Sequence, residues 1–470
     1  MQINVNRLVF PGFWFGKTAQ EDALSLARMG VGGFCLYGGT KQQVADLVRK
    51  LRAASPLPRI LIAADYEDGL GRWLPDAELL PSNLAIGASH NEDLAFTKGL
   101  ITATQARLIG VDWVFAPVVD LADNPKNPII NTRAFGKDPD LVIRMARAFM
   151  KGLSQGGALN SIKHFPGHGN TSTDSHLSMP VMENTKDGLK TALRPFQALL
   201  NDADSVMIGH LLVPMIDNKY PASLSPLLIK ELLQKRMGFK KCVCTDALSM
   251  KALGDEKQAA LQALAAGAHL LLVPEKPFEL LEFLKGQPID ENLLKTAEQQ
   301  LNALCAKADE LSSAPSCPSA NDFIFRAARA CLVSTGTLPP LEPGETVHYL
   351  SVGNDENLPE TMFLNTLTAH GITAVPFEDK ADFLVILLWR RYQAFKGKIA
   401  LSKEELAQVE QATLQAKQTV LVCLSNPWLA SALPAQARIF TFSPTPIFQQ
   451  AAAEVLLGKF KPGGTLPIDL

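Results

Sequence analysis

The chain has 470 residues, of which 47% are hydrophobic and 20% are charged. This composition excludes an intrinsically disordered protein, and the length exceeds what one hydrophobic core usually organises, so we expect two domains. The 45 basic and 47 acidic residues give a formal net charge of −2, which excludes a general attraction to nucleic acid or to an anionic membrane. We therefore expect a small-molecule partner.

The first residues, MQINVNRLVFPGFWFGKT, are interrupted by Pro11 and Gly12 and contain no small-residue cleavage site, so we expect no signal peptide. No apolar run reaches the roughly 18 residues that a membrane span needs. Seven scattered cysteines suit a reducing compartment, and we expect a cytoplasmic protein. Cys242 and Cys244 allow a metal or redox pair, but within KKCVCTD they are typical of buried strand residues.

Short apolar runs alternate with longer helical patterns from residue 5 to about residue 275. Apolar residues recur at helical spacing in EDLAFTKGLITATQARLIG and LVIRMARAFMKGLSQGG, and the second segment ends in the glycine pair expected past a helix. The strand candidates are 7–13, 31–38, 59–65, 111–121, 158–166, 205–214, 240–246 and 269–275. Eight strands alternating with helices predict a (β/α)8 barrel of the TIM type over 1–313, with a doubly wound open sheet as the alternative.

Polar side chains follow five of these strands at the point where each strand ends. A single aspartate at a strand end often caps the next helix, but barrel enzymes place their chemistry at the carboxyl ends of the strands, so five such ends indicate a common site. The residues are Asp65, Asp120, Lys163 with His164, His210, and Asp246.

The most polar strand end is the loop KHFPGHGNTSTDSHLSMP, which covers 163–180. It brings His164, His168, His176 and Asp174 into one neighbourhood. Three interpretations stay open on these residues alone: acid/base catalysis with Asp174 beside His176, a metal site, or a hydrogen-bonded structural loop.

A second domain is predicted after the barrel. The segment 314–322, rich in proline, serine and alanine, breaks the helical pattern and is interpreted as a linker. Residues 323–470 then return to apolar strand patterns and two long helical patterns, which predict a smaller α/β sandwich domain. The strand candidates of this domain are 346–353, 381–389, 419–425 and 437–443.

The 163–180 loop resembles the signature loop of the β-N-acetylglucosaminidases of glycoside hydrolase family 3, of the bacterial two-domain type. The pattern KHFPGHG, two spaced threonines and Asp-Ser-His is matched without a gap. CTDALSM, with Asp246, resembles the nucleophile segment of the family. DYEDG followed by Arg72 resembles its sugar-binding loop, and NTRAFGKDP its segment with a substrate-binding arginine, here Arg133.

The resemblance implies a retaining glycosidase, in which Asp246 is the nucleophile and His176 with Asp174 is the acid/base pair. The implied substrate-binding residues are Asp65, Arg72, Arg133, Lys163 and His164. This chain departs from the family pattern at Asp68, at an inserted Leu-Gly before Arg72, and at Ala247, where the family often has an acidic residue. No metal and no cofactor are expected, because the protein groups supply both proton and nucleophile.

The implied substrate is a terminal β-linked N-acetylglucosamine, and together with the expected cytoplasmic location this suggests muropeptides of cell-wall recycling. The protein is expected to be a monomer or a weak homo-oligomer. A family 3 glycoside phosphorylase, a β-glucosidase or a β-xylosidase are the alternative enzymes, and a sugar-binding protein without turnover is the non-enzymatic alternative. That last alternative is disfavoured by the presence of Asp246, Asp174 and His176.

Overall fold

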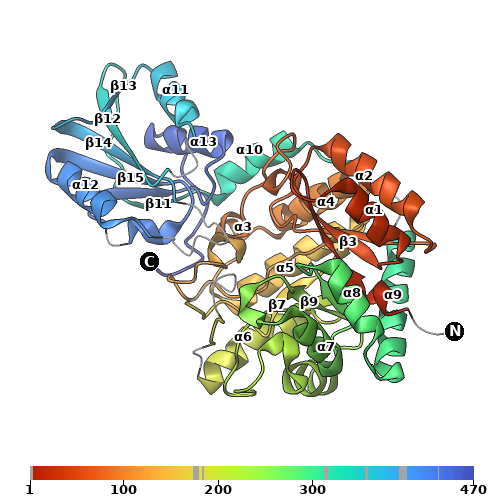
Figure 1. Ribbon diagram of the computed structural model, residues 1–470. Coiled ribbons are helices and arrows are strands. Elements are labelled where there is room, and N and C mark those ends of the chain that lie inside the picture. The colour runs from red at the N-terminus through yellow and green to blue at the C-terminus, as the bar shows by residue number, and fades with distance from the viewer. Residues whose placement is uncertain are drawn as a thin grey trace.

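The computed structural model describes residues 4–172, 179–182, 185–311, 316–354, 358–390, 400–431 and 433–470. Figure 1 shows two bodies: a barrel built from the first two thirds of the chain, and a smaller sheet with helices on both faces built from the remainder.

The barrel strands form two parallel five-stranded sheets within the described ranges, in the orders β1-β10-β9-β8-β7 and β2-β3-β4-β5-β6. β1 continues into β2 after Pro11, and β6 continues into β7 after Ser161, so the ten segments make eight successive strands. The first of these pairs with the last, Val9 opposite Leu271, which a doubly wound open sheet does not permit. The predicted (β/α)8 barrel is confirmed.

The strand segments are short, and each overlaps a predicted strand, with β2 and β9 extending one residue past the predicted ends. They are β1 (Val9–Phe10), β2 (Gly12–Trp14), β3 (Gly33–Tyr37), β4 (Leu61–Ala64), β5 (Trp113–Val114), β6 (Leu159–Asn160), β7 (Ile162–Phe165), β8 (Ser205–Ile208), β9 (Cys242–Ala247) and β10 (Leu270–Leu272). The prediction was too long at 111–121, where the regular ladder ends at Val114. Pro117 has no N–H to donate, so the strand continues only as an isolated bridge between Val118 and Lys163.

Helices between the strands cover the outside of the barrel (Figure 1). They are α1 (Gln20–Arg28), α2 (Lys41–Ala54), α3 (Asn83–Ser89), α4 (Glu92–Leu108), α5 (Pro139–Gln155), α6 (Lys186–Leu199), the π-helix η5 (Leu227–Arg236), α7 (Glu256–Ala266), α8 (Pro277–Lys285) and α9 (Glu291–Glu310). Short 3-10 turns are η1 (Val5–Leu8), η2 (Leu70–Arg72), η3 (Asn131–Arg133), η4 (Ala222–Leu224) and η6 (Lys251–Leu253). Parallel strands covered in this way are buried on both faces, and β3, β4, β7 and β8 are accordingly almost entirely inaccessible.

The C-terminal domain contains a six-stranded sheet in the order β11-β16-β15-β14-β12-β13. Only its edge strand β11 runs antiparallel among the described strands. The strands are β11 (Val333–Gly336), β12 (Thr346–Val352), β13 (Thr373–Pro376), β14 (Ala381–Leu388), β15 (Ala416–Cys423) and β16 (Ala437–Phe440). The helices are α10 (Ala320–Cys331), α11 (Thr361–Ala369), α12 (Lys403–Leu414), α13 (Pro446–Leu456) and the turn η7 (Pro427–Ala430). Helices α11 and α13 lie on one face and α12 on the other, as expected for an α/β sandwich (Figure 1).

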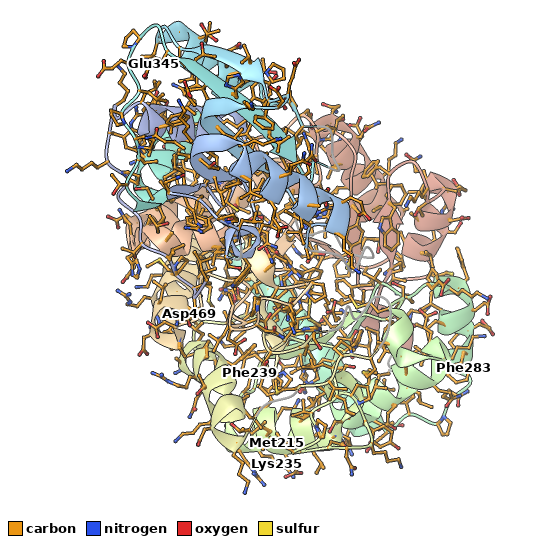
Figure 2. The ribbon with its side chains drawn as sticks, turned by 90° about the vertical axis from the view of Figure 1, so that its left-hand side faces the viewer. Met215, Lys235, Phe239, Phe283, Glu345 and Asp469 are labelled. Carbon is orange, nitrogen blue, oxygen red and sulfur yellow. The ribbon has the colours of Figure 1, made fainter. Side chains whose placement is uncertain are left out.

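The two domains meet along α3 and the last residues of the chain. α10 packs against α3 and α4. The C-terminal residues run along the barrel, where the N–H of Thr465 donates to the carbonyl of Ala88 and the N–H of Lys137 donates to that of Pro467, both at 2.9 Å. Asp469 accordingly lies beside the barrel in Figure 2, whereas Glu345 lies at the far end of the C-terminal domain. The domain limits drawn from the sequence stay a prediction.

No helix in the described part of the chain is both long enough and apolar enough to cross a bilayer. All seven cysteines carry free thiols, and Cys242 and Cys244 are buried in β9.

The barrel contains a buried histidine that must stay neutral. His269 lies just before β10, and its Nδ1 accepts a hydrogen bond from the backbone N–H of Val243 at 3.0 Å. Burial lowers the pKa of His269 from 6.5 to about 4. Between pH 6.5 and about pH 4 the unfolded chain binds a proton at His269 that the folded chain does not. The free energy of unfolding therefore decreases as the pH falls through this range, by about 1.4 kcal/mol per pH unit and about 3 kcal/mol in all.

We expect His269→Gln to weaken this acid dependence, because a glutamine can still accept the Val243 N–H but cannot bind a proton. The measurement is the free energy of unfolding of the barrel in urea as a function of pH, followed by tryptophan fluorescence. The variant should lose less stability than the wild type between about pH 6.5 and 4, with parallel curves above about pH 7.5. Identical acid slopes in both proteins would contradict the assignment.

Candidate active site

The carboxyl ends of the barrel strands bring the predicted polar residues together. Asp65 follows β4, Lys163 and His164 lie within β7, and Asp246 lies within β9. Because all strands run parallel, these ends face the same side of the barrel, where barrel enzymes carry their chemistry.

Lys163 forms the centre of the first group of contacts. Its side chain is only 1% exposed, and its Nζ lies 2.7 Å from Asp65 Oδ1 and 2.7 Å from Glu67 Oε1. Burial by itself lowers the pKa of Lys163, but the carboxylates of Asp65 and Glu67 outweigh it and hold that pKa above its ordinary value. Lys163 is therefore an ammonium ion at neutral pH.

Glu67 joins this ammonium to Arg133. Arg133 Nε donates to Glu67 Oε2 at 2.8 Å and Nη2 donates to Oε1 at 2.5 Å, a bidentate pair. Burial by itself raises the pKa of Glu67, but Arg133 and Lys163 outweigh it, so that pKa lies well below its ordinary value. The result is an alternating series of charges in which Asp65, Lys163, Glu67 and Arg133 hold one another in place.

His164 is oriented by Asp120. Asp120 Oδ2 lies 2.7 Å from His164 Nδ1, and the carboxylate also accepts the backbone N–H groups of His164 at 3.1 Å and of His168 at 2.7 Å. Burial by itself raises the pKa of Asp120, but His164 outweighs it and lowers that pKa. An ionised Asp120 can only accept, so Nδ1 of His164 carries the hydrogen and Nε2 faces Arg133 Nη2 at 3.5 Å.

Asp246 lies half-buried near the end of β9, and its Oδ1 accepts the backbone N–H of Ala247 at 2.8 Å. Burial by itself raises its pKa, but His164, His210 and the Ala247 N–H outweigh it and leave that pKa below its ordinary value. The neighbouring His210 is part of the wall, with Nδ1 2.7 Å from Ser223 Oγ and Nε2 3.0 Å from the carbonyl of Ala247. Asp246 is therefore a carboxylate at neutral pH.

His168 belongs to the loop but is not suited to proton transfer at neutral pH. Its ring is buried, and its Nδ1 lies 2.8 Å from Thr171 Oγ1. Burial, reinforced by repulsion from His164, lowers the pKa of His168 from 6.5 to about 4. His168 thus has a neutral ring that supports the loop.

Arg72 lies in η2, on the loop that follows β4. Together with Arg133 it lines a pocket between this loop, η3 and the C-terminal domain. The lining residues are Asp68, Arg72, Leu79, Leu80, Ser82, Thr132, Arg133, Ser425, Phe442, Ser443 and Pro444. Of the residues predicted to bind substrate, Asp65, Lys163 and His164 belong to one network, which Arg133 joins through Glu67 and through His164. Arg133 also lines the adjoining pocket together with Arg72.

An aromatic wall stands beside Asp65. The rings of Trp14 and Tyr37 stack with centroids 4.9 Å apart, and Tyr37 meets Trp73 edge to face at 5.1 Å. The indole N–H of Trp73 donates to the carbonyl of Asp65 at 3.1 Å. Trp73 therefore fixes the backbone of Asp65 and keeps a partly exposed ring at the site.

The predicted acid/base residues Asp174 and His176 lie outside the described residues. Within the described ranges, no group of three or more histidine, cysteine or acidic side chains is arranged to hold a metal ion.

Residues 1–306 match the N-terminal domain of glycosyl hydrolase family 3. The chain belongs to this family. A β-hexosaminidase of Neisseria meningitidis serogroup B is 31% identical over 353 residues, which cover 72% of this chain and 94% of that protein. A family 3 β-N-acetylglucosaminidase from Paenibacillus sp. matches with a TM-score of 0.86 at 26% identity, over 99% of this chain and 98% of that chain. A β-glucoside phosphorylase at 22% identity shares the fold, with a TM-score of 0.89 over 99% of this chain and 93% of that chain.

The sequence did not single out Glu67 in this family 3 chain. The only signal was its place in DYEDG, two residues after Asp65. These two carboxylates form a network with Lys163 of β7 and Arg133 of η3, but the three segments are neighbours only in the fold. Asp120 was recognised as a strand-end residue, and the structure shows that it orients His164 as well as capping the loop.

Glu67→Gln should weaken substrate binding without unfolding the barrel. The amide keeps the shape of the side chain but loses the charge that holds Arg133 and Lys163, so we expect kcat/KM to fall roughly 10- to 100-fold. Glu92→Gln is the matched control, because Glu92 forms only an exposed pair with Arg144 at 3.7 Å. Wild-type kinetics in a folded Glu67→Gln protein would show that the network is not needed for activity.

Proposed function

We propose that this family 3 chain is a retaining β-N-acetylglucosaminidase that removes terminal, non-reducing β-linked N-acetylglucosamine. The observation that carries the proposal is the ionised carboxylate of Asp246 near the end of β9, on the same side of the barrel as the Lys163 and His164 contacts at the end of β7. The substrate class is supported by the names of the Neisseria and Paenibacillus relatives.

In the proposed reaction, Asp246 attacks the anomeric carbon as the bond to the leaving oxygen breaks, and a covalent glycosyl-enzyme forms. Water then attacks the same carbon and releases Asp246, so two inversions give net retention. A depressed pKa suits this role, because the group must be a carboxylate before the sugar binds.

The acid/base role is assigned to His176 with Asp174. A histidine has an unperturbed pKa of about 6.5, and a carboxylate partner stabilises its imidazolium, so it can donate a proton near neutral pH and accept one afterwards. This part rests on the loop motif, which begins at Lys163 and continues beyond Thr171. The neutral, buried His168 does not compete for the role.

The sugar itself is proposed to be bound by Asp65, Arg72, Arg133, Lys163 and His164. A carboxylate accepts from sugar hydroxyls, whereas the ammonium and guanidinium groups donate to sugar oxygens. Because Lys163 already bonds Asp65 and Glu67, these groups need little rearrangement when the sugar enters.

The finer physiological role is also a proposal. A cytoplasmic location together with this specificity suggests muropeptides as natural substrates, acted on by a monomer or weak homo-oligomer without a cofactor.

Aryl β-N-acetylglucosaminide turnover should exceed that of the β-glucoside and β-xyloside, and it should not depend on inorganic phosphate. A sugar 1-phosphate product would instead assign a phosphorylase.

Asp246→Ala should fold normally and lose activity by roughly 10⁴-fold or more, because the proposed covalent intermediate forms on the carboxylate that this change removes. The direct test is inactivation of the wild type by 5-fluoro-N-acetylglucosaminyl fluoride, followed by peptide mass spectrometry. The adduct is expected on Asp246. A stable adduct on another side chain, or near-normal turnover by folded Asp246→Ala, would overturn the nucleophile assignment.

His176→Ala should slow natural substrates severely but aryl glycosides of acidic phenols much less, because a good leaving group departs without a proton. Asp174→Ala should give a smaller loss of the same kind, and azide should restore turnover of activated substrates by His176→Ala. His370→Ala is the control, because His370 lies at the C-terminal end of α11 in the C-terminal domain. Equal losses across the leaving-group series, with no azide rescue, would remove His176 from the acid/base role.

A further inference from the structure

A second buried lysine lies between the two segments that carry the arginines of the site. Lys98 projects from α4, and its side chain is 0% exposed. Its Nζ lies 2.9 Å from Asp68 Oδ1, on the loop that leads into η2, and 2.6 Å from Asn83 Oδ1, at the start of α3. The ring of Phe149 lies 5.9 Å from the same nitrogen, within the range of a cation–π contact. The proposed reaction gives Lys98 no role, although a fully buried charge is costly to keep.

Lys98 is a cation that orients the amide of Asn83. Burial lowers the pKa of Lys98, but the carboxylate of Asp68 opposes this shift and favours the ammonium form. An ammonium donates hydrogen bonds and cannot accept them, so Asn83 presents its oxygen to Lys98. Asn83 is only 1% exposed, so water does not compete for this contact. The charge of Lys98 therefore decides which end of the Asn83 amide faces away from it.

The other end of that amide holds the segment of Arg133. Asn83 Nδ2 donates to the backbone carbonyl of Arg133 at 2.8 Å. The guanidinium of Arg133 forms the bidentate pair with Glu67, so both the backbone and the side chain of this arginine are held. If the Asn83 amide were reversed, its oxygen would face the Arg133 carbonyl, and two acceptors would repel each other. An uncharged side chain in place of Lys98 would remove the preference for the observed orientation.

The loop that carries Arg72 is tied to the same lysine through Asp68, a position where this chain departs from the family pattern. The inserted Leu70 and Gly71 lie on this loop. Leu70 is inaccessible, and a Cβ on Gly71 would come within 2.3 Å of the backbone nitrogen of Leu79, so the lengthened loop packs tightly against the chain that follows it. The ion pair of Asp68 anchors the loop to α4 just before this insertion.

Stability alone accounts poorly for the buried pair of Lys98 and Asp68. The loss of water offsets most of the attraction between buried charges, and apolar side chains of similar volume often give equal stability. What apolar side chains cannot give is direction. The ammonium fixes the position of one carboxylate and the orientation of one amide, and these two groups belong to the two segments that carry the arginines.

We propose that Lys98 is a positioning residue for substrate binding, whose ammonium holds the Arg72 loop through Asp68 and the Arg133 segment through Asn83. Because Lys98 is fully buried, it acts through these neighbours and does not itself touch the sugar. The inference rests on the proposed function for the role of the two arginines in binding the sugar.

Two variants separate positioning from stability. Lys98→Met should unfold at a lower urea concentration than the wild type, because the Asp68 carboxylate is left without its partner. The double variant Lys98→Met/Asp68→Asn removes both charges and should recover much of that stability. In both variants we expect KM for the aryl glycoside to rise roughly 10-fold with kcat changed less than about 3-fold, because a binding contact shared by ground and transition states affects KM alone. Lys151→Met is the matched control, since Lys151 is an exposed lysine of the neighbouring helix α5.

Asn83→Asp tests the link to Arg133 directly. The carboxylate keeps the shape of the side chain and still accepts from Lys98, but it cannot donate to the Arg133 carbonyl. We expect the same rise in KM, and in the Kd for N-acetylglucosamine followed by tryptophan fluorescence. A purely structural role would lower the urea midpoint and the fraction of active protein without changing KM. Recovered stability together with wild-type KM in the double variant would overturn the inference, and wild-type KM in Asn83→Asp decides in the same way if the Lys98 variants do not fold.

Arg133→Ala distinguishes failure of this inference from failure of the proposed function. A raised KM in Arg133→Ala beside a wild-type KM in Asn83→Asp rejects the positioning role and keeps the arginine as a sugar-binding residue. A wild-type KM in Arg133→Ala rejects the sugar-binding assignment, and the positioning role with it. If the wild type prefers a β-glucoside or a β-xyloside, the variants are measured on that substrate, and raised KM values there support the role of Lys98 while rejecting N-acetylglucosamine.

Discussion

The ammonium of Lys163 is buried at the end of β7, and a buried charge is tolerated only where opposite charges and hydrogen bonds compensate for the lost water. Asp65 and Glu67, both from the loop after β4, provide that compensation at 2.7 Å each. The contact therefore fixes β7 relative to the β4 loop, and through Glu67 it also fixes Arg133. A site held by its own ion pairs is arranged before any sugar arrives, which is the condition for electrostatic stabilisation of a transition state.

The same principle accounts for the other half of the site. Asp120 is buried beneath the loop and is neutralised by His164 and by two backbone N–H groups, so that one carboxylate sets both the loop conformation and the histidine tautomer. His164 then lowers the pKa of Asp246 across the barrel. The lowered pKa of the proposed nucleophile thus depends on His164 and His210, which come from other parts of the barrel, as well as on the neighbouring Ala247 N–H.

The C-terminal domain extends this arrangement beyond the barrel. Ser82 and Asn83 are adjacent residues, yet one is bonded to Phe442 of the C-terminal sheet domain and the other to Arg133 of the candidate site. The start of α3 therefore links the C-terminal domain to the backbone of Arg133 through two neighbouring hydrogen bonds. The Paenibacillus enzyme superposes on both domains of this chain at once, with a TM-score of 0.86 over 99% of the chain, so the two structures share the same arrangement of domains.

The sequence by itself determined the barrel, the strand-end positions of Asp65, Lys163, His164 and Asp246, and the family, because alternating strands and helices and a contiguous motif are local properties of the chain. It did not determine that Glu67 bridges Lys163 and Arg133, or that Ser425 and Ser443 line the same pocket as the two arginines. Those contacts depend on which strands are neighbours in the ring and on how the second domain packs against α3. Burial by itself would raise the pKa of each carboxylate in the site. Whether the group is ionised therefore depends on nearby cations, and only the tertiary structure brings these within reach.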